Sequence, residues 1–179
     1  GCALVCPEKA IRETPRTIGE VARGASGSIR FVEGRLQIGQ PMSPPIIRAV
    51  KRHLPRTGIA ILDAPPGTAC PMMETVRDAD IVLLVTEPTV FGLHDLTLAV
   101  EAVRKVGVPF AVALNRVGSG GDGVQRYCTQ ANIPVLLQVP EDRRIAEVYS
   151  RGDLVAQHIP GFDGRMTDLF ARLRAAVRS

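Results

Sequence analysis

The stretch Gly58-Ile-Ala-Ile-Leu-Asp-Ala-Pro-Pro-Gly-Thr-Ala-Cys-Pro71 decides how the rest of the chain is interpreted. Residues 59–62 form a short continuous apolar run, which is typical of a strand buried on both faces of a parallel sheet. Asp63 ends the run, and a loop with two prolines and Gly67 follows it. A carboxylate at the carboxyl end of a buried parallel strand lies where open α/β sheets bind their ligands. The alternative is an acid that only opens a Pro-Pro-Gly turn.

Downstream of this stretch, apolar runs with the length of buried strands alternate with helical patterns. Strands are predicted over 80–86, 108–115 and 133–139, and helices over 71–78, 91–106, 124–131, 140–149 and 166–177. Such alternation forms right-handed βαβ units. The predicted fold class is therefore α/β, with a mostly parallel sheet flanked by helices. The carboxyl ends of the four predicted strands would meet at one rim, where ligand-binding residues gather.

The first third of the chain has a different pattern. Residues 14–27 are polar and contain glycine without a clear period. The alternation in 28–32 and the apolar residues of 35–38 predict a hairpin with its turn at Glu33-Gly34. Two prolines at the first turn predict a helix over 44–54.

Composition and charge exclude several classes of protein. The chain has 179 residues, 45% hydrophobic and 22% charged, which suits one globular α/β domain. Its net charge of +4 is scattered and only 4% of residues are aromatic, which argues against nucleic acid as a partner. No apolar run has membrane-spanning length and no signal-peptide pattern is recognised in these residues, so a cytoplasmic location is predicted.

Two cysteines near the start of the chain have a specific spacing. Cys2-x3-Cys6-Pro7 matches the end of the C-x2-C-x2-C-x3-C-P signature of bacterial ferredoxins, whose thiolates bind 4Fe-4S clusters. The first two cysteines of the signature are missing, so Cys2 and Cys6 are predicted to be ligands of an incomplete iron–sulfur site. The chain opens in the middle of this motif and is expected to be a fragment. The alternative is two unrelated cysteines near a chain end.

Four further stretches resemble the MinD/ParA/Mrp/NifH class of P-loop ATPases. They are 63–71, 84–95, 114–116 and 139–152. With the ferredoxin-like tail, the likeness covers roughly 1–152, and the tail selects the subfamily with an inserted ferredoxin domain. The implied domains are 1–27, the tail of the ferredoxin-like insert, and 28–179, the C-terminal part of a nucleotide-binding domain.

The resemblance implies a catalytic side of the site. Asp63 resembles the acid that holds Mg²⁺ through water, and Gly67 resembles the glycine near the γ-phosphate of ATP. Glu87 and Pro88 match a stretch near the nucleotide without an assigned task. Cys70 follows the same loop, and a small buried cysteine is the favoured interpretation.

The resemblance also implies a base-binding side. Asn115 resembles the residue that reads adenine, because its amide both donates and accepts hydrogen bonds. Arg116 lies beside it in the motif. Pro140, Glu141 and Asp142 resemble the loop that lines the other side of the base. The role of His94, which lies in the 84–95 stretch, is left open.

One departure from the family affects the expected activity. No G-x-x-x-x-G-K-[ST] motif occurs in the chain, and the Gly-rich stretch 118–123 lacks a lysine. In the family the phosphate loop lies upstream of the ferredoxin insert. We therefore expect this chain alone to bind ATP weakly or not at all and not to hydrolyse it. A missing first strand would leave an exposed groove that favours self-association.

Two classes of function remain after this comparison. The first is a homodimeric ATPase of the MinD type, coupled to an iron–sulfur domain and acting on a redox or metal-cluster partner protein. The second is a non-hydrolytic scaffold or iron–sulfur cluster carrier with the same fold. An amidotransferase or ligase of the cobyrinate-synthase type shares the fold, but the glutamine-handling residues that it needs are not recognised here.

Overall fold

The computed structural model describes residues 1–118 and 120–178, and the chain divides into two compact units. The first unit, Gly1–Ile61, contains α1 (Cys2–Val5), β1 (Gly19–Ser26), β2 (Ile29–Leu36) and α2 (Pro44–Lys51). The second unit, Leu62–Ser179, contains α3 (Cys70–Val76), β3 (Val82–Thr86), α4 (Val90–Val106), β4 (Phe110–Val117), α5 (Gly123–Gln130), β5 (Val135–Pro140), α6 (Arg143–Ser150), α7 (Val155–His158) and α8 (Phe162–Arg178).

The first unit is a hairpin covered by one helix. β1 and β2 pair in antiparallel fashion along their whole lengths, and Gly27, with φ +57°, lies in the turn between them. The prediction of a turn at Glu33-Gly34 is wrong, because both residues lie inside β2. Gly34 is needed there for packing rather than for turning. A Cβ at this position would lie 2.9 Å from Cγ1 of Ile46, so its absence lets α2 approach the hairpin.

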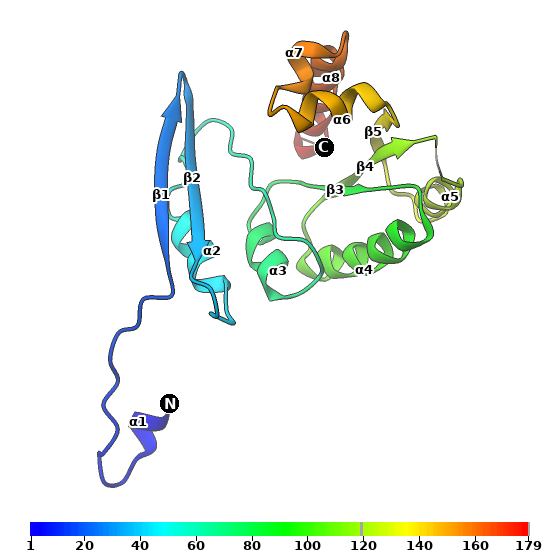
Figure 1. Cartoon of the computed structure of the whole chain (residues 1–179). Helices are drawn as coiled ribbons and strands as arrows, with labels where there is room; N and C mark the ends of the chain where they lie inside the picture. The colour runs from blue at the N-terminus through cyan, green and yellow to red at the C-terminus, as the bar shows by residue number, and fades with distance from the viewer. Residues whose placement is uncertain (119, 179) are drawn as a thin grey trace. The chain divides into compact units, whose positions relative to one another are not determined.

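The second unit has the predicted α/β fold class, with a parallel sheet flanked by helices (Figure 1). The sheet has the order β3-β4-β5, and its three strands confirm the predictions over 80–86, 108–115 and 133–139. Figure 1 shows α3 and α4 below the sheet and α6, α7 and α8 above it. A βαβ unit of this kind carries its connections on the faces of the sheet, which buries both faces.

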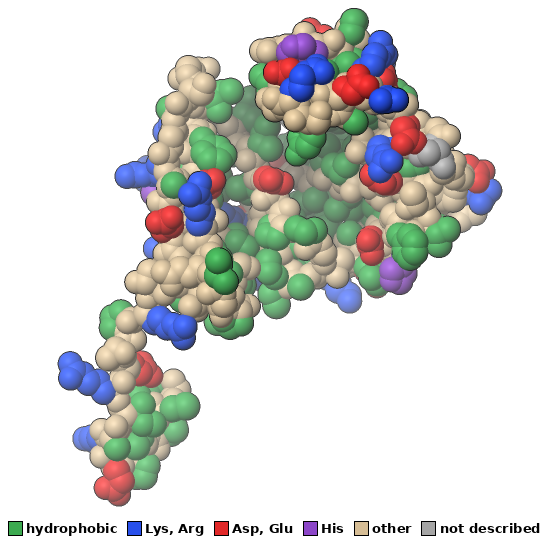
Figure 2. Space-filling view, viewed as in Figure 1, with side chains coloured by type: hydrophobic (Ala, Val, Ile, Leu, Met, Phe, Trp, Pro, Cys, Tyr) green, Lys and Arg blue, Asp and Glu red, His purple; other side chains and the backbone are tan. Residues whose placement is uncertain are grey.

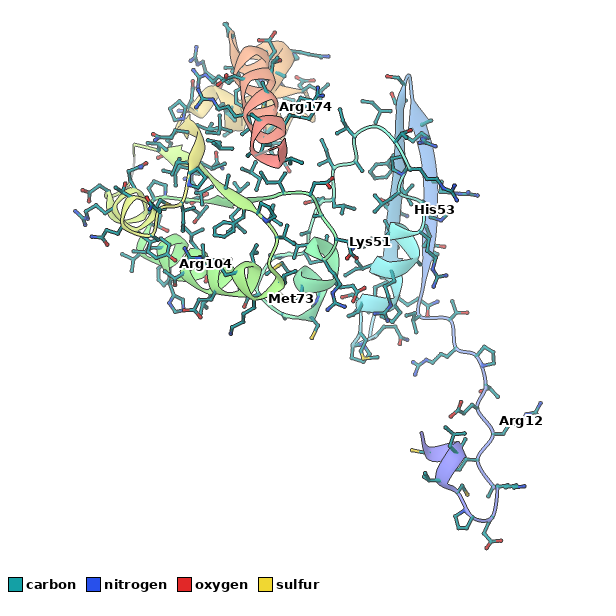
Figure 3. The ribbon with its side chains drawn as sticks, turned by 180° about the vertical axis from the view of Figure 1, so that it is seen from behind. Arg12, Lys51, His53, Met73, Arg104 and Arg174 are labelled. Atoms are coloured by element: carbon teal, nitrogen blue, oxygen red, sulfur yellow. The ribbon has the colours of Figure 1, made fainter. Side chains whose placement is uncertain are left out.

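The core of the second unit lies between the sheet and the helices on its lower face. Leu96 and Val100 of α4 and Val112 and Leu114 of β4 form a buried cluster with residues of α5. A second cluster joins α3, β3 and α4, and Figure 3 shows Met73 on α3 beside it. These contacts hold α4 against the sheet and so fix the position of the loop that precedes α4.

The predicted strand at 59–62 does not form. Ile59 and Ile61 are 64% and 90% exposed, and no strand pairing includes them. A strand needs a neighbour for its backbone N–H and C=O groups. Among the described residues β3 has a hydrogen-bonded neighbour on one side only, so no partner strand is available for this segment. Three strand ends therefore meet at one rim, where four were predicted.

Several local features complete the fold. The helix predicted from Pro140 begins at Arg143, because Pro140 ends β5 and Asp142 is the N-cap. The sequence pattern does not predict α1 and α7, which have 4 residues each. None of the helices in the described part of the chain has both the length and the apolar character that a membrane span requires.

Candidate functional site

The candidate site lies at the carboxyl ends of the three parallel strands. β3 ends at Thr86, β4 at Val117 and β5 at Pro140, and several of the residues singled out from the sequence lie in these strand ends or in the loops that follow them. The strands run in the same direction, so these ends share one rim of the sheet. Figure 2 shows basic and acidic side chains gathered near the ends of β4 and β5 and on α6.

A β-bulge at the end of β4 shapes this rim. Leu114 pairs with Gln138 and Val117 pairs with Pro140, so two residues of β4, Asn115 and Arg116, lie opposite one residue of β5. Arg116 has φ +55°, the left-handed conformation that residues other than glycine rarely adopt. Bulges redirect side chains and are common next to binding sites. The sequence motif predicted neither the bulge nor this conformation.

The guanidinium of Arg116 connects the end of β4 to the loops after β3 and β5. Its Nη2 donates to Oε1 of Glu141 over 2.9 Å, and its Nη1 lies 3.5 Å from Oε1 of Glu87. The hydrogen bond to Glu141, and then the charge of Glu87, raise the pKa of Arg116. We call Glu87, Asn115, Arg116, Glu141 and Asp142 the rim cluster.

The loop after β5 is held by hydrogen bonds in its backbone and side chains. The N–H of Glu141 donates to the carbonyl of Val117 over 2.9 Å, which ties this loop to the end of β4. Asp142 Oδ1 accepts from the backbone N–H of Arg144 over 2.9 Å, the usual N-cap contact. The Arg144 side chain donates to both carboxylate oxygens of Asp142. Its Nε lies 3.1 Å from Oδ1 and 3.0 Å from Oδ2, and its Nη2 lies 2.6 Å from Oδ2. Hydrogen bonds from this side chain, and then from the Arg144 backbone, lower the pKa of Asp142.

The loop after β3 is fixed by the start of α4. Thr89 caps this helix by accepting from the N–H of Gly92 over 2.9 Å, and Thr86 Oγ1 donates to the carbonyl of Gly92 over 2.9 Å. A Cβ on Gly92 would collide with the carbonyl oxygen of Glu87. The close approach of Gly92 therefore positions Glu87 within reach of Arg116. The sequence motif flagged Glu87 but gave it no task, and the structure shows that it pairs with Arg116.

The Gly-rich stretch after β4 lies against the loop after β3. A Cβ on Gly120 would overlap the carbonyl oxygen of Pro88, so only glycine fits this contact. Pro88 and Gly120 thus bring the loops after β3 and β4 into contact beside the rim cluster. Ser119, within the Gly-rich stretch 118–123, lies outside the described residues.

The structure brings together only part of the predicted site. Asn115 is half-buried, Arg116 and Glu141 are exposed, and Pro140 is the exposed last residue of β5. Asp63 is exposed, and Gly67 has φ +92° in the loop before α3. No hydrogen bond or ion pair between described residues joins Asp63 or Gly67 to the rim cluster. The catalytic roles of Asp63 and Gly67 stay predictions.

The predicted metal and cluster ligands do not belong to a larger group of ligand side chains in the described part of the chain. Cys2 is exposed and Cys6 is half-buried, on and just after α1 in the first unit. Within 1–118 and 120–178 no group of three or more His, Cys, Asp or Glu side chains could hold a metal ion. A 4Fe-4S cluster takes four thiolates. Among the described residues Cys2 and Cys6 therefore do not complete an iron–sulfur site, and the role of Asp63 towards Mg²⁺ stays a prediction.

The other two cysteines and His94 lie in different environments. Cys70 is exposed, so the interpretation of a buried packing residue is wrong: the first residue of the short helix α3 stays open to solvent. Cys128 of α5 is buried in the core, and burial raises the pKa of its thiol. His94 lies on the exposed side of α4.

Comparisons with known proteins give distant likenesses. No family model matches the chain. "Uncharacterized protein MJ0579" from Methanocaldococcus jannaschii is 27% identical over 155 residues, which are 86% of this chain and 54% of the relative. "Uncharacterized protein MJ0578" from the same organism is 31% identical over 105 residues, 58% of this chain and 38% of the relative.

A third relative has a functional term in its name. "Uncharacterized ATP-binding protein MJ0169", also from Methanocaldococcus jannaschii, is 35% identical over 88 residues, 48% of this chain and 34% of the relative. The chain thus spans about half the length of MJ0579 and about a third of the other two. The distant likeness to a protein named as ATP-binding hints at a nucleotide-binding family.

Proposed function

We propose that the rim cluster binds the base of a purine nucleotide, in the first instance ATP. The observation that carries this proposal is the bridge of Arg116 to Glu87 and Glu141, which joins the end of β4 to the loops after β3 and β5 beside Asn115. Open α/β sheets bind ligands at this edge. The half-buried amide of Asn115 on the bulge can donate from its NH2 group to N1 of adenine and accept with its carbonyl oxygen from the N6 amino group. The likeness to a relative named as ATP-binding supports the same ligand.

The finer features of the family are proposals for the whole protein. In that proposal, Asp63 would hold Mg²⁺ through water, Gly67 would lie near the γ-phosphate, and Cys2 and Cys6 would be part of a ferredoxin-type iron–sulfur region. The protein would act as a cytoplasmic, homodimeric ATPase of the MinD type with a redox or metal-cluster partner protein. The domain division at 27/28 stays a prediction, although it falls in the turn of the β1–β2 hairpin.

The second candidate is a non-hydrolytic scaffold or iron–sulfur carrier. This candidate requires no phosphate loop of the G-x-x-x-x-G-K-[ST] type, and none occurs within residues 1–179. Such a loop supplies most phosphate contacts in P-loop ATPases. Under this alternative, nucleotides would not bind the rim cluster at all, so a binding measurement separates the two candidates.

The test is an NMR titration of the ¹⁵N-labelled chain with AMP and with ATP. We expect weak binding, with a dissociation constant of about 1 mM or higher, because base contacts act without a phosphate loop. Amide shifts should change at 115–118 and 140–144. N115D, which replaces the amide by an acceptor-only carboxylate, should abolish them.

Asn132 offers a matched control for Asn115. It precedes β5 and therefore lies at the amino ends of the parallel strands, opposite the rim. N132D thus makes the same chemical change away from the rim cluster. Binding by N132D should equal that of the unaltered chain. Shift changes that are absent at saturating AMP, or that centre on residues outside the rim cluster, would overturn the proposal.

A further inference from the structure

The two acids that follow β5 are both engaged by arginines. Glu141 accepts from Arg116 over 2.9 Å, and Asp142 is gripped through both oxygens by the Arg144 side chain. The side chain of Asp142 is 21% exposed, whereas that of Arg144 is 68% exposed. Both oxygens of the Asp142 carboxylate thus accept hydrogen bonds from Arg144, the more exposed partner of the pair.

A carboxylate without an arginine partner at the position of Asp142 or Glu141 would favour guanine over adenine. Guanine presents the N1–H and N2 amino donors side by side, which a carboxylate accepts together. Adenine presents an acceptor, N1, beside its N6 amino donor, so a carboxylate facing that edge meets one repulsive contact. A carboxylate whose lone pairs are already taken by a guanidinium gives guanine no such advantage.

We propose that Arg144 and Arg116 are specificity-determining residues, which disfavour guanine nucleotides by occupying Asp142 and Glu141. The inference rests on the proposed function, because it concerns the base that binds at the rim cluster. Asn115 supplies the attractive contact to adenine, and the two arginines remove the attractive contact to guanine. Discrimination achieved in this way needs both elements.

Arg144 gives the sharper experiment, because its backbone and side chain act separately on Asp142. In R144A the backbone N–H at position 144 still donates to Oδ1, so the N-cap of α6 is retained. Only the guanidinium contacts to Asp142 are lost. Arg116, by contrast, has a left-handed backbone, so its substitution also changes the strain of the bulge.

The measurement compares AMP and GMP on the same samples by NMR titration. The unaltered chain should bind AMP about fivefold more tightly than GMP. R144A should lower that ratio to about one or below, by gaining affinity for GMP. The ratio of the AMP affinity to the GMP affinity is the quantity to compare, because loss of a positive charge weakens the attraction to the phosphate groups of AMP and GMP alike. R144K should keep a ratio near that of the unaltered chain.

Two variants act as controls for this result. R143A removes the neighbouring pair between Arg143 and Glu147, which does not involve the rim cluster, and should leave the ratio unchanged. The double variant D142N/R144A lacks the carboxylate and should lose the gain in GMP affinity. Melting curves of each variant verify that it is folded.

The outcomes separate the two claims. If neither AMP nor GMP binds the unaltered chain, the proposed function fails and the inference falls with it. If AMP and GMP both bind the unaltered chain and R144A weakens both affinities by the same factor, the proposed function stands and the inference is overturned. The same holds if R143A changes the affinity ratio as much as R144A does. A GMP gain in R144A that persists in D142N/R144A also overturns it, because the carboxylate would not be its source.

Discussion

Arg116 donates to Glu141 over 2.9 Å from the extra residue of a bulge, with its own backbone at φ +55°. The residue thus combines an unfavourable backbone conformation with a bridge between loops. Left-handed conformations cost little for glycine and more for any residue with a Cβ. The side chain and the backbone of Arg116 should therefore make opposite contributions to stability.

Two substitutions separate those contributions. Both R116G and R116A remove the bridge to Glu87 and Glu141, but only R116G accepts φ +55° without strain. We expect R116G to melt about 3 °C above R116A by calorimetry. Equal melting temperatures for the two variants would contradict the left-handed conformation of residue 116.

The ion pair of Asp142 predicts a dependence of stability on pH. The pKa of Asp142 is lowered in the folded chain by Arg144, so its contribution is fully present above the unfolded value of about 3.9. The contribution is lost as the pH falls through the folded pKa. The difference in denaturation midpoint between the unaltered chain and D142N should therefore narrow below about pH 4.

D142A supplies the comparison for the cap itself. Asn is a good N-cap and Ala is not, so D142N keeps an acceptor for the Arg144 N–H and D142A loses it. The difference between D142N and D142A should not change with pH. A gap between the unaltered chain and D142N that stays constant through acidic pH would rule out the charge effect.

Gly92 should resist substitution although it lies in a helix. A Cβ in G92A would collide with the Glu87 carbonyl and lie 2.9 Å from Thr86 Oγ1, so the start of α4 must shift. We expect a loss of about 1–3 kcal/mol in the free energy of unfolding, measured by urea denaturation. The shift should also displace Glu87 from Arg116.

Gly164 in α8 is the matched position, because an added Cβ there meets nothing within 4 Å. G164A should be neutral or should stabilise by about 0.5 kcal/mol, as expected for Gly→Ala in a helix. If G92A is as well tolerated as G164A, the close contact between α4 and the loop after β3 is not needed.

The cysteines should differ in reactivity towards a thiol reagent. Cys2 and Cys70 are exposed and Cys6 is half-buried, whereas Cys128 is buried and has a raised pKa. Because the thiolate is the reactive form, the first three should label in the native chain. Cys128 should label only on unfolding in urea, as followed by peptide mass spectrometry. Rapid labelling of Cys128 in the native chain would show that α5 is not packed against α4 and β4.

The edge of β3 should promote self-association. Val85 is 66% exposed on a strand that has a hydrogen-bonded neighbour on one side only among the described residues. Lysine on an edge strand discourages pairing with another chain. We expect V85K to sediment as a monomer under conditions where the unaltered chain associates.

Val90 controls for the added charge in that experiment. It is 83% exposed at the start of α4 and not on a strand, so V90K should associate like the unaltered chain. If V90K abolishes association as completely as V85K, net charge rather than the strand edge is responsible. An unaltered chain that is monomeric at all concentrations would exclude the predicted homodimer for this chain.

The sheet was predictable from the sequence wherever a partner strand is present. The apolar runs of β3, β4 and β5 and the caps of α4, Thr89 and Gly107, fix these elements locally. The run at 59–62 has the same composition, but composition does not report whether a neighbouring strand exists. Gly34 resembles a turn residue, yet it serves a contact with Ile46 from a helix further along the chain.

The site was predictable only in part, for a related reason. The motif around Asn115 and the acids after β5 marked which residues gather at the rim. The bridge from Arg116 to Glu87 depends on the bulge and on the close approach of Gly92, and neither has a local signature in the sequence. The ion pair between Asp142 and Arg144 also has no signature in the motif, although the two residues are nearly adjacent.

The bulge in β4 makes the rim sensitive to the number of residues and not only to their kind. Because Asn115 and Arg116 face one residue of β5, deletion of Arg116 would remove the irregularity between Leu114 and Val117. The core residues up to Leu114 would keep their register, and the fold would survive. In such a deletion variant the connecting guanidinium would be lost while the scaffold stayed intact, so ligand recognition and foldability are encoded separately at the end of a single strand.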